Sequence, residues 1–248
     1  MFEVELHFTP GLAFFLPRDL RKERVVRRGL RGKTAVKDGI EACGVPHPEV
    51  DLIAVRVGRE QQRVDFEWPV EAAVKLEICG VPAVARGLQV RRLERFVADG
   101  HLGTLTRNLR LLGVDTMYER DADDRRLLEI MQAEDRALLT RDRRLLMHAV
   151  VRHGYCPRSR EGEEQTREVL RRFELGPESL APYTRCLRCN GRLLSVPKTE
   201  VLEPLAGQPR TLRYYKEFRR CEACHAIYWP GTHFEELAGR IGRLLRAE

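Results

Sequence analysis

The middle of the chain alternates short apolar runs with segments of helical periodicity, and this order constrains the fold more than any other feature. Between residues 93 and 178, apolar runs at 114–118 and 137–140 flank a helical segment at 124–134. An earlier helix, ended by Gly113, is indicated by leucines at helical spacing: Leu102, Leu105, Leu109 and Leu112. This β-α-β-α-β order predicts a parallel sheet with helices on its faces and right-handed crossovers.

Aspartates stand where these predicted strands end or where the next helix begins. Asp99 ends the run 96–98, Asp142 ends the run 137–141, and Asp124 opens the helical segment. In an open parallel sheet, ligands bind at the edge formed by the carboxyl ends of the strands. Carboxylates gathered there repel one another unless a divalent cation neutralises them, and Mg²⁺ and Mn²⁺ favour such all-oxygen sites. We therefore expect an acidic catalytic cluster in which Asp99 and Asp142 bind Mg²⁺ or Mn²⁺ and Asp124 assists.

Each of these residues also has a purely structural interpretation. An aspartate ahead of a helix is commonly its N-cap, and either Asp123 or Asp124 can cap the helix that follows. We favour Asp124 for the site. Asp115 is either a peripheral carboxylate or a turn residue. The hydroxyl of Thr140 can orient a carboxylate or a metal-bound water, or Thr140 is simply a β-branched strand residue.

Arginines flank the same predicted edge of the sheet. We expect Arg107 and Arg141, together with Thr140, to contact substrate, because guanidinium groups pair well with phosphates. An exposed helical arginine is more often only part of a solvated face. A net charge of +7 and a pI near 9.2 fit a polyanionic partner such as nucleic acid.

Cysteines near the end of the chain form two C-x-x-C pairs, with residues 190–220 between them. The four thiolates suit a tetrahedral Zn²⁺ site without an open position, and thus a structural one: Cys186, Cys189, Cys221 and Cys224. The alternative is disulfides or redox pairs. An odd number of cysteines and no recognisable signal peptide favour the reducing cytoplasm instead. We expect a zinc-ribbon hairpin with a strand over 212–218 and a helical tail over 234–245.

Aromatic side chains in this predicted ribbon have two readings. They can stack on bases of a nucleic acid, or they can fill the core that so small a domain needs: Tyr214, Tyr215, Tyr228 and Trp229.

The first part of the chain has strand-like pieces around one short helical segment at 36–43, which predicts a small α+β sheet domain. Residues 80–93, with Pro82 and Gly87, are typical of a linker. No apolar stretch approaches the roughly 20 residues needed to cross a bilayer, so we expect no membrane association.

Several of these motifs together resemble a known family. The stretches 96–103, 109–116, 138–142, 185–191 and 228–233 are similar to the PIN-like ribonuclease domain named for the carboxy terminus of the exonuclease Mut-seven. Residues 44–50 resemble the ubiquitin-like β-grasp domain often fused ahead of it. The resemblance implies an α/β protein with a β-grasp domain at 1–88, a PIN-like parallel sheet flanked by helices at 93–178, and a zinc ribbon with a C-terminal helix at 183–248.

The resemblance also implies metal-dependent RNA cleavage with Asp99, Asp124 and Asp142 as the acidic site. PIN nucleases often carry a fourth acid soon after the Thr-x-Asp motif, where this chain has Arg143 and Arg144. We therefore expect a ribonuclease, an endonuclease in mode, with a possible protein partner for the β-grasp domain.

Two other functions compete with this expectation. The first is a non-catalytic RNA-binding adaptor that uses the ribbon and the basic surface. The second is phosphoryl transfer with Asp99 as nucleophile. This chain has no second aspartate two residues after Asp99, which argues against that function.

Overall fold

The computed structural model describes residues 1–57, 60–81 and 87–245, which form two compact units. The first unit consists of Met1–Leu93 and Asp123–Arg158, and the second of Glu94–Ala122 and Ser159–Glu248. Each unit therefore takes in segments that are distant along the chain. Pro82 of the predicted linker lies outside the described residues.

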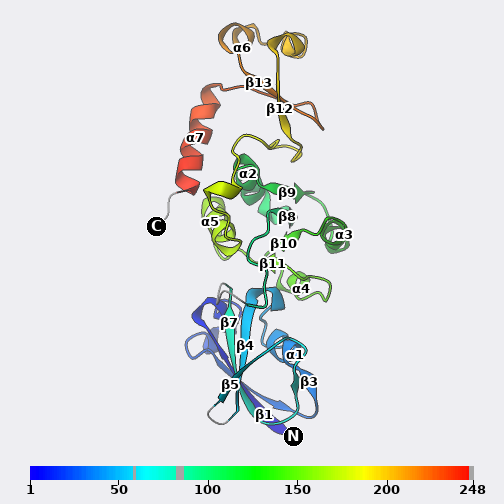
Figure 1. Ribbon diagram of the computed structural model, residues 1–248, viewed down its shortest axis with the longest axis vertical. Coiled ribbons are helices and arrows are strands. Elements are labelled where there is room, and N and C mark those ends of the chain that lie inside the picture. Colours follow the sequence, from blue (N-terminus) through cyan, green and yellow to red (C-terminus); the bar gives the residue numbers. More distant parts are fainter. Residues whose placement is uncertain (58–59, 82–86, 246–248) are drawn as a thin grey trace. The chain divides into compact units, whose positions relative to one another are not determined.

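A five-stranded sheet forms the N-terminal part of the first unit (Figure 1). Its order is β2-β1-β7-β4-β5, with β1 and β7 parallel and the other neighbours antiparallel. The strands are β1 Phe2–Phe8, β2 Val25–Leu30, β4 Val50–Val57, β5 Glu60–Val64 and β7 Val74–Gly80. A short pair, β3 Thr34–Ala35 and β6 Pro69–Val70, and helix α1 Val36–Glu41 complete it, with 3-10 turns at Pro10–Leu12, Arg18–Leu20 and His47–Glu49.

The alternation of the sequence builds the core of this sheet. Val4, Leu6 and Phe8 point to one face of β1 and are buried. Val36 and Ile40, one helical turn apart on α1, are buried as well. The predicted α+β domain is thus confirmed. Residues 87–89 of the predicted linker lie against β4, where the backbone N–H of Leu88 donates to the carbonyl of Asp51 at 2.7 Å.

The second segment of this unit contains two helices and a parallel strand pair. Helix α3 spans Asp124–Glu134, as predicted, and ends at Asp135 in a left-handed conformation. Strand β10 Ala137–Leu139 is fully buried and pairs in parallel with β11 Gly154–Tyr155. Between them lies the one-turn helix α4, Arg143–Leu146.

The second unit also starts from a parallel strand pair. Strand β8 Arg95–Ala98 pairs with β9 Asp115–Tyr118, and helix α2 Gly103–Leu111 connects them after a 3-10 turn at Gly100–Leu102. Helix α5 Gly162–Arg172 packs on α2, and Asn108 of α2 donates to the hydroxyl of Thr166 at 3.0 Å. A further 3-10 turn follows at Pro177–Ser179. The chain is therefore a mixed α/β protein with parallel strands flanked by helices, as predicted.

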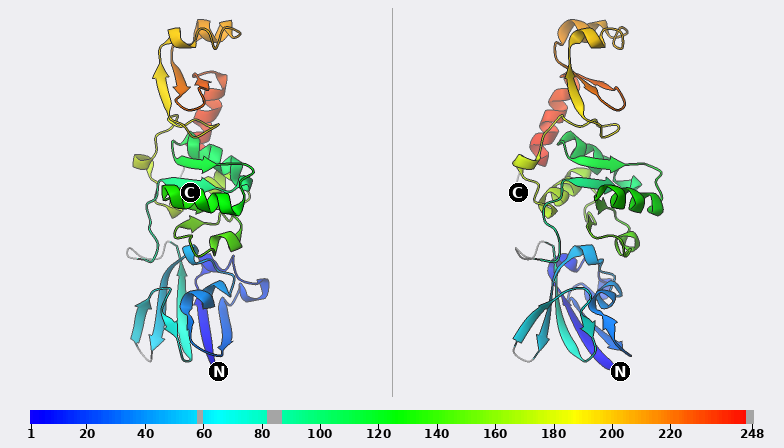
Figure 2. Two further views of the ribbon diagram at one scale, coloured as in Figure 1. Left: turned by 90° about the vertical axis from the view of Figure 1, so that its right-hand side faces the viewer. Right: turned by 45° about the vertical axis from the view of Figure 1, so that its right-hand side comes forward.

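A three-stranded antiparallel sheet, order β12-β13-β14, forms the ribbon (Figure 2), and Cys221 ends its middle strand. Its strands are β12 Leu193–Val196, β13 Phe218–Cys221 and β14 Ile227–Tyr228, with a 3-10 turn at Lys198–Val201. The predicted strand over 212–218 is wrong: Pro209 starts helix α6, Pro209–Tyr214, and the strand begins only at Phe218. The last helix of the described residues is α7, Thr232–Leu244, which packs on α5.

None of the helices in the described part of the chain is both long and apolar enough to cross a bilayer.

Candidate functional site

Asp99 follows β8 directly and is 9% exposed. Its Oδ1 accepts hydrogen bonds from the backbone N–H of His101 at 2.7 Å and from the His101 ring at 3.0 Å. His101 was not among the predicted site residues, although the Asp-x-His spacing was a signal for it. Because a Cβ on Gly100 would lie 2.2 Å from the carbonyl oxygen of Arg120, only glycine fits after Asp99.

The hydroxyl of Tyr118 donates to the carbonyl of Gly100 at 2.8 Å, so the turn after Asp99 is fixed to the end of β9. A buried strand on one side and this close approach on the other hold Asp99 in place.

Asp123 and Asp124 have different positions at the start of α3. Asp123 is the N-cap, and its carboxylate accepts from the backbone N–H of Arg126 at 2.8 Å. Asp124 occupies the first helical position, where its carboxylate is exposed and does not serve as the cap. The positive end of the helix dipole favours a carboxylate there. The structure thus leaves Asp124 the freer of the two acids for a ligand.

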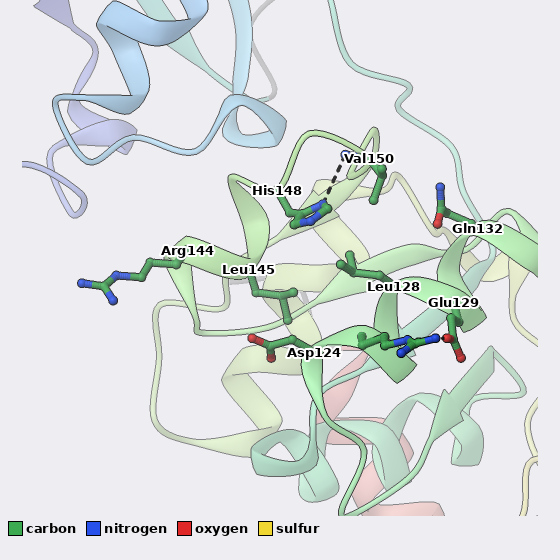
Figure 3. A pocket seen from close by; sticks show the side chains of 9 residues that line it. Asp124, Leu128, Glu129, Gln132, Arg144, Leu145, His148 and Val150 are labelled. Atoms are coloured by element: carbon green, nitrogen blue, oxygen red, sulfur yellow. Dashed lines mark hydrogen bonds and ion pairs between the residues drawn. The ribbon is translucent and has the colours of Figure 1, made fainter.

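A hollow of about 510 Å³ lies beside Asp124 (Figure 3). Its apolar members are Leu128, Leu145 and Val150, and the ring of His148 accepts from the backbone N–H of Val150 at 3.5 Å. The guanidinium of Arg144 extends away from the other lining side chains. The remaining lining residues are Arg125, Glu129 and Gln132.

Asp142 follows β10 and is the N-cap of α4. Its Oδ1 accepts from the backbone N–H groups of Arg144 at 2.7 Å and Leu145 at 3.3 Å. The backbone N–H of Asp142 in turn donates to the hydroxyl of Thr140 at 2.9 Å. Thr140 is fully buried, so in this structure its hydroxyl shapes the turn that presents Asp142.

The three aspartates belong to different units: Asp99 to the second, and Asp124 and Asp142 to the first. Each follows a strand or opens a helix, as predicted. Their meeting around one cation stays a prediction.

The four cysteines lie together, as predicted. The Sγ atoms of Cys186 and Cys224 are 3.6 Å apart, those of Cys189 and Cys221 are 3.4 Å apart, and all four lie within 4.8 Å of one another. Zn–S bonds of about 2.3 Å in a tetrahedron place the sulfurs about 3.8 Å apart. The cluster is therefore compatible with a structural zinc.

Tyr228 supports this cluster, since its hydroxyl lies 3.1 Å from the Sγ of Cys186. Burial acts to raise the pKa of Cys186, but hydrogen bonds from Tyr228 and from backbone N–H groups lower it to about 7. Burial raises the pKa of Cys189 and of Cys224 in the same cluster, so a bound cation would be needed to keep all four cysteines as thiolates.

Comparison with known proteins decides the family. Residues 94–241 match the model of the Mut7-C RNAse domain, which is more than half of the chain. The chain belongs to the Mut7-C RNAse family. Residues 1–82 match the Mut7-C ubiquitin model, so the expected resemblance is confirmed in both parts.

A curated relative of this Mut7-C chain is the human "Exonuclease mut-7 homolog", which is 34% identical over 203 residues. The match covers 73% of this chain but only 23% of that protein. The chain thus spans about a quarter of the length of that relative. No solved structure matches.

The arginines predicted to flank the site of this Mut7-C domain differ in their surroundings. Arg107 lies exposed on α2, whereas Arg141 is partly buried. Arg110 is buried, and its guanidinium donates to the carbonyls of Thr116 at 2.9 Å, Leu187 at 3.2 Å and Arg188 at 3.0 Å. Burial lowers the pKa of Arg110, whose role is to join α2 and β9 to the first cysteine pair.

The ribbon aromatics divide between the two readings. Tyr215 and Trp229 pack against the ribbon core of Val201, Leu205 and Phe218. Tyr214, by contrast, is 71% exposed.

Proposed function

We propose that this chain is a divalent-metal-dependent ribonuclease that cuts RNA phosphodiesters internally. The observation that carries the proposal is the match to the Mut7-C RNAse domain, because it includes Asp99, Asp124 and Asp142 within residues 94–241. Each of these aspartates stands at a strand end or a helix start, where the sequence analysis placed it.

The donor set fits a hard cation, because carboxylate oxygens are the ligands that Mg²⁺ and Mn²⁺ prefer. In this proposal Asp99 and Asp142 hold the cation, and Asp124 orients water from the first turn of α3. The cation supplies Lewis acidity at the scissile phosphate. Arg107 and Arg141 bind flanking phosphates, and Thr140 acts through Asp142 by holding its backbone N–H.

The other parts of the chain have supporting roles in this proposal. The chain has three domains, at residues 1–88, 93–178 and 183–248, and the last of them holds a structural zinc. RNA is the substrate, and the ubiquitin-like domain contacts a protein partner. The protein acts in the cytoplasm, where four zinc thiolates stay reduced.

Pure protein incubated with a circular RNA and Mn²⁺ or Mg²⁺ tests this function. We expect cleavage that a chelator stops, and a circular substrate has no ends for an exonuclease to attack. Asp99→Asn and Asp142→Asn keep side-chain size but remove a charge, so they should abolish cleavage and leave RNA binding intact or stronger. If the Asn variants cut at the wild-type rate, the acidic site is wrong.

One observation favours an RNA-binding adaptor as the second candidate. Arg143 and Arg144 stand where PIN nucleases often have a fourth acid, and the chain carries a net charge of +7. Binding of RNA with a steep salt dependence, but no cleavage with any divalent cation, would support the adaptor.

A further inference from the structure

We propose that the ubiquitin-like domain is a positioning element for Asp142, and that Arg143 is the residue through which it acts. This inference rests on the proposed function of Asp142 as a metal ligand. It gives the domain a role inside the enzyme, in addition to any partner that it contacts.

Helix α4 cannot fix the position of Asp142 unaided. It has four residues, Arg143–Leu146, and one turn of helix is marginal in water without tertiary contacts. Asp142 is the N-cap of this turn, so its carboxylate moves with the turn. Leu145 and Leu146 are buried and hold the end of this turn in the core, and its first residue, Arg143, makes a contact of its own.

Arg143, the residue directly after Asp142, makes this contact with the ubiquitin-like domain. Its guanidinium donates to the carbonyls of Phe15 at 2.9 Å and Phe14 at 3.0 Å. It also lies over both rings, with its Cζ 5.0 Å from the Phe14 centroid and 5.2 Å from the Phe15 centroid. A planar guanidinium can make two directed hydrogen bonds and stack at once, which a lysine cannot.

The turn that receives Arg143 is itself held firmly. Arg158 lies over the Phe15 ring at 4.8 Å and the Tyr155 ring at 4.6 Å. Both of its terminal nitrogens donate to the carboxylate of Glu49, at 2.9 and 2.6 Å, and Glu49 is 1% exposed. The ubiquitin-like domain therefore meets residues 143–158 through a buried, charged and aromatic joint rather than a loose contact.

The same contact gives a reason for the departure from the acidic pattern of PIN nucleases. The positively charged guanidinium of Arg143 binds carbonyls and aromatic rings of the N-terminal domain, which an acidic side chain could not do. Arg144, the next residue, is exposed and extends away from the other lining residues in Figure 3. Arg144 is therefore the matched control.

The test compares Arg143→Ala, Arg143→Lys and Arg144→Ala in the full chain. Mn²⁺ binding is followed by electron paramagnetic resonance, cleavage by kcat and KM, and the amides of 143–147 by hydrogen exchange. We expect Arg143→Ala to weaken Mn²⁺ binding about tenfold, as loss of a ligand-orienting contact does, and to lower kcat at unchanged KM. Exchange should quicken in α4, Arg143→Lys should restore part of each effect, and Arg144→Ala should change neither Mn²⁺ binding nor exchange.

A second variant approaches the joint from the other side. Phe14→Leu removes one ring but keeps its carbonyl, and it lies far from Asp142 in sequence. It should weaken Mn²⁺ binding more mildly, and the double variant with Arg143→Ala should be no worse than Arg143→Ala alone, because both act through one contact. This pair also separates positioning from a general loss of folding.

The outcomes separate the two proposals. Wild-type Mn²⁺ binding and exchange in Arg143→Ala would overturn the positioning role and leave the nuclease intact. A wild-type protein that binds Mn²⁺ but never cuts RNA would end the nuclease proposal, while the Mn²⁺ titrations would still support or overturn the role of Arg143. A wild type that binds no Mn²⁺ would end both.

Discussion

Asp123 and Asp124 are adjacent and chemically identical, yet the structure gives them separate tasks. Asp123→Ala should cost about 1 kcal/mol of stability through loss of the cap, with Mn²⁺ binding unchanged. Asp124→Asn should lower cleavage and leave the melting temperature close to wild type. Asp123→Asn, which can still cap, serves as the control. Equal loss of activity from Asp123→Asn and Asp124→Asn would contradict this division.

Arg107 is exposed whereas Arg141 is partly buried, so Arg107 is the better placed of these two predicted phosphate contacts. Arg107→Ala should weaken RNA binding and reduce the slope of log K against log salt concentration by about 1, because one phosphate contact is lost. Fluorescence anisotropy at several salt concentrations measures both. Arg56→Ala is the control, since Arg56 lies on β4 of the ubiquitin-like domain and is paired with Glu77 at 2.8 Å. An unchanged slope for Arg107→Ala would exclude the contact.

At the scale of elements, the ribbon is tied to α2 and β9 by more than chain connectivity. Asn190 donates to Asp115 at 2.7 Å and accepts from the backbone N–H of Thr116 at 3.0 Å. Arg110 donates to carbonyls between Cys186 and Cys189. If the ribbon opens, Arg110 keeps its buried position but loses two acceptors, which is costly for a charged group.

Loss of zinc should therefore be felt beyond the ribbon. Cys189→Ser, or treatment with a chelator, should lower zinc content and unfold β12 to β14, because metal binding supplies much of the folding energy of a small ribbon. We also expect faster hydrogen exchange in β9, whereas β8 should keep its protection. Cys79→Ser, outside the ribbon, is the control. Unchanged exchange in β9 after zinc loss would show that the ribbon is energetically separate.

The docking of α7 on α5 depends on a charge pair and therefore on pH. Arg243 donates to Glu163 at 2.9 Å, and this bond holds the pKa of Glu163 below its usual range. The contribution is present above the ordinary carboxyl pKa and is lost as pH falls through the lowered value. Protection of the α7 amides should fall over that range and at high salt.

Glu163→Gln should remove this pH dependence. Glu129→Gln is the control, because Glu129 pairs with Arg125 on its own helix, α3, at 3.1 Å. A pH profile that Glu163→Gln leaves unchanged would mean that the Arg243–Glu163 pair does not hold α7 on α5.

At the scale of the whole molecule, the buried pair Glu49–Arg158 joins segments that are distant in sequence. Breaking it by Glu49→Gln leaves the partly buried guanidinium of Arg158 without its counter-charge and should cost about 3 kcal/mol, or on the order of 10 °C in melting temperature. The double change Glu49→Leu with Arg158→Met should recover part of that loss. Glu77→Gln is the control, because its partner Arg56 is on the surface, and it should cost under about 1 kcal/mol.

Calorimetry measures these differences. A Glu49→Gln variant as stable as Glu77→Gln would show that the joint contributes little to folding. It would also weaken the case that the ubiquitin-like domain positions Asp142.

What the sequence by itself determined was local. The helix at 124–134, the glycine after α2 and the two C-x-x-C pairs follow from spacing, because helical periodicity and chelation act over a few residues. The same local reasoning failed at 212–218, where Leu212 and Phe218 both face one small core but belong to a helix and a strand.

What only the tertiary structure decided depends on contacts between distant residues. Nothing near Arg143 in sequence indicates that its guanidinium meets Phe14 and Phe15, and nothing near Arg110 indicates the cysteine loop. Likewise, spacing could not assign the cap to Asp123 rather than Asp124. A hydrogen bond or a buried ion pair forms only between groups that lie close together in space. Which groups lie close together is set by the packing of the whole unit rather than by the order of neighbouring residues.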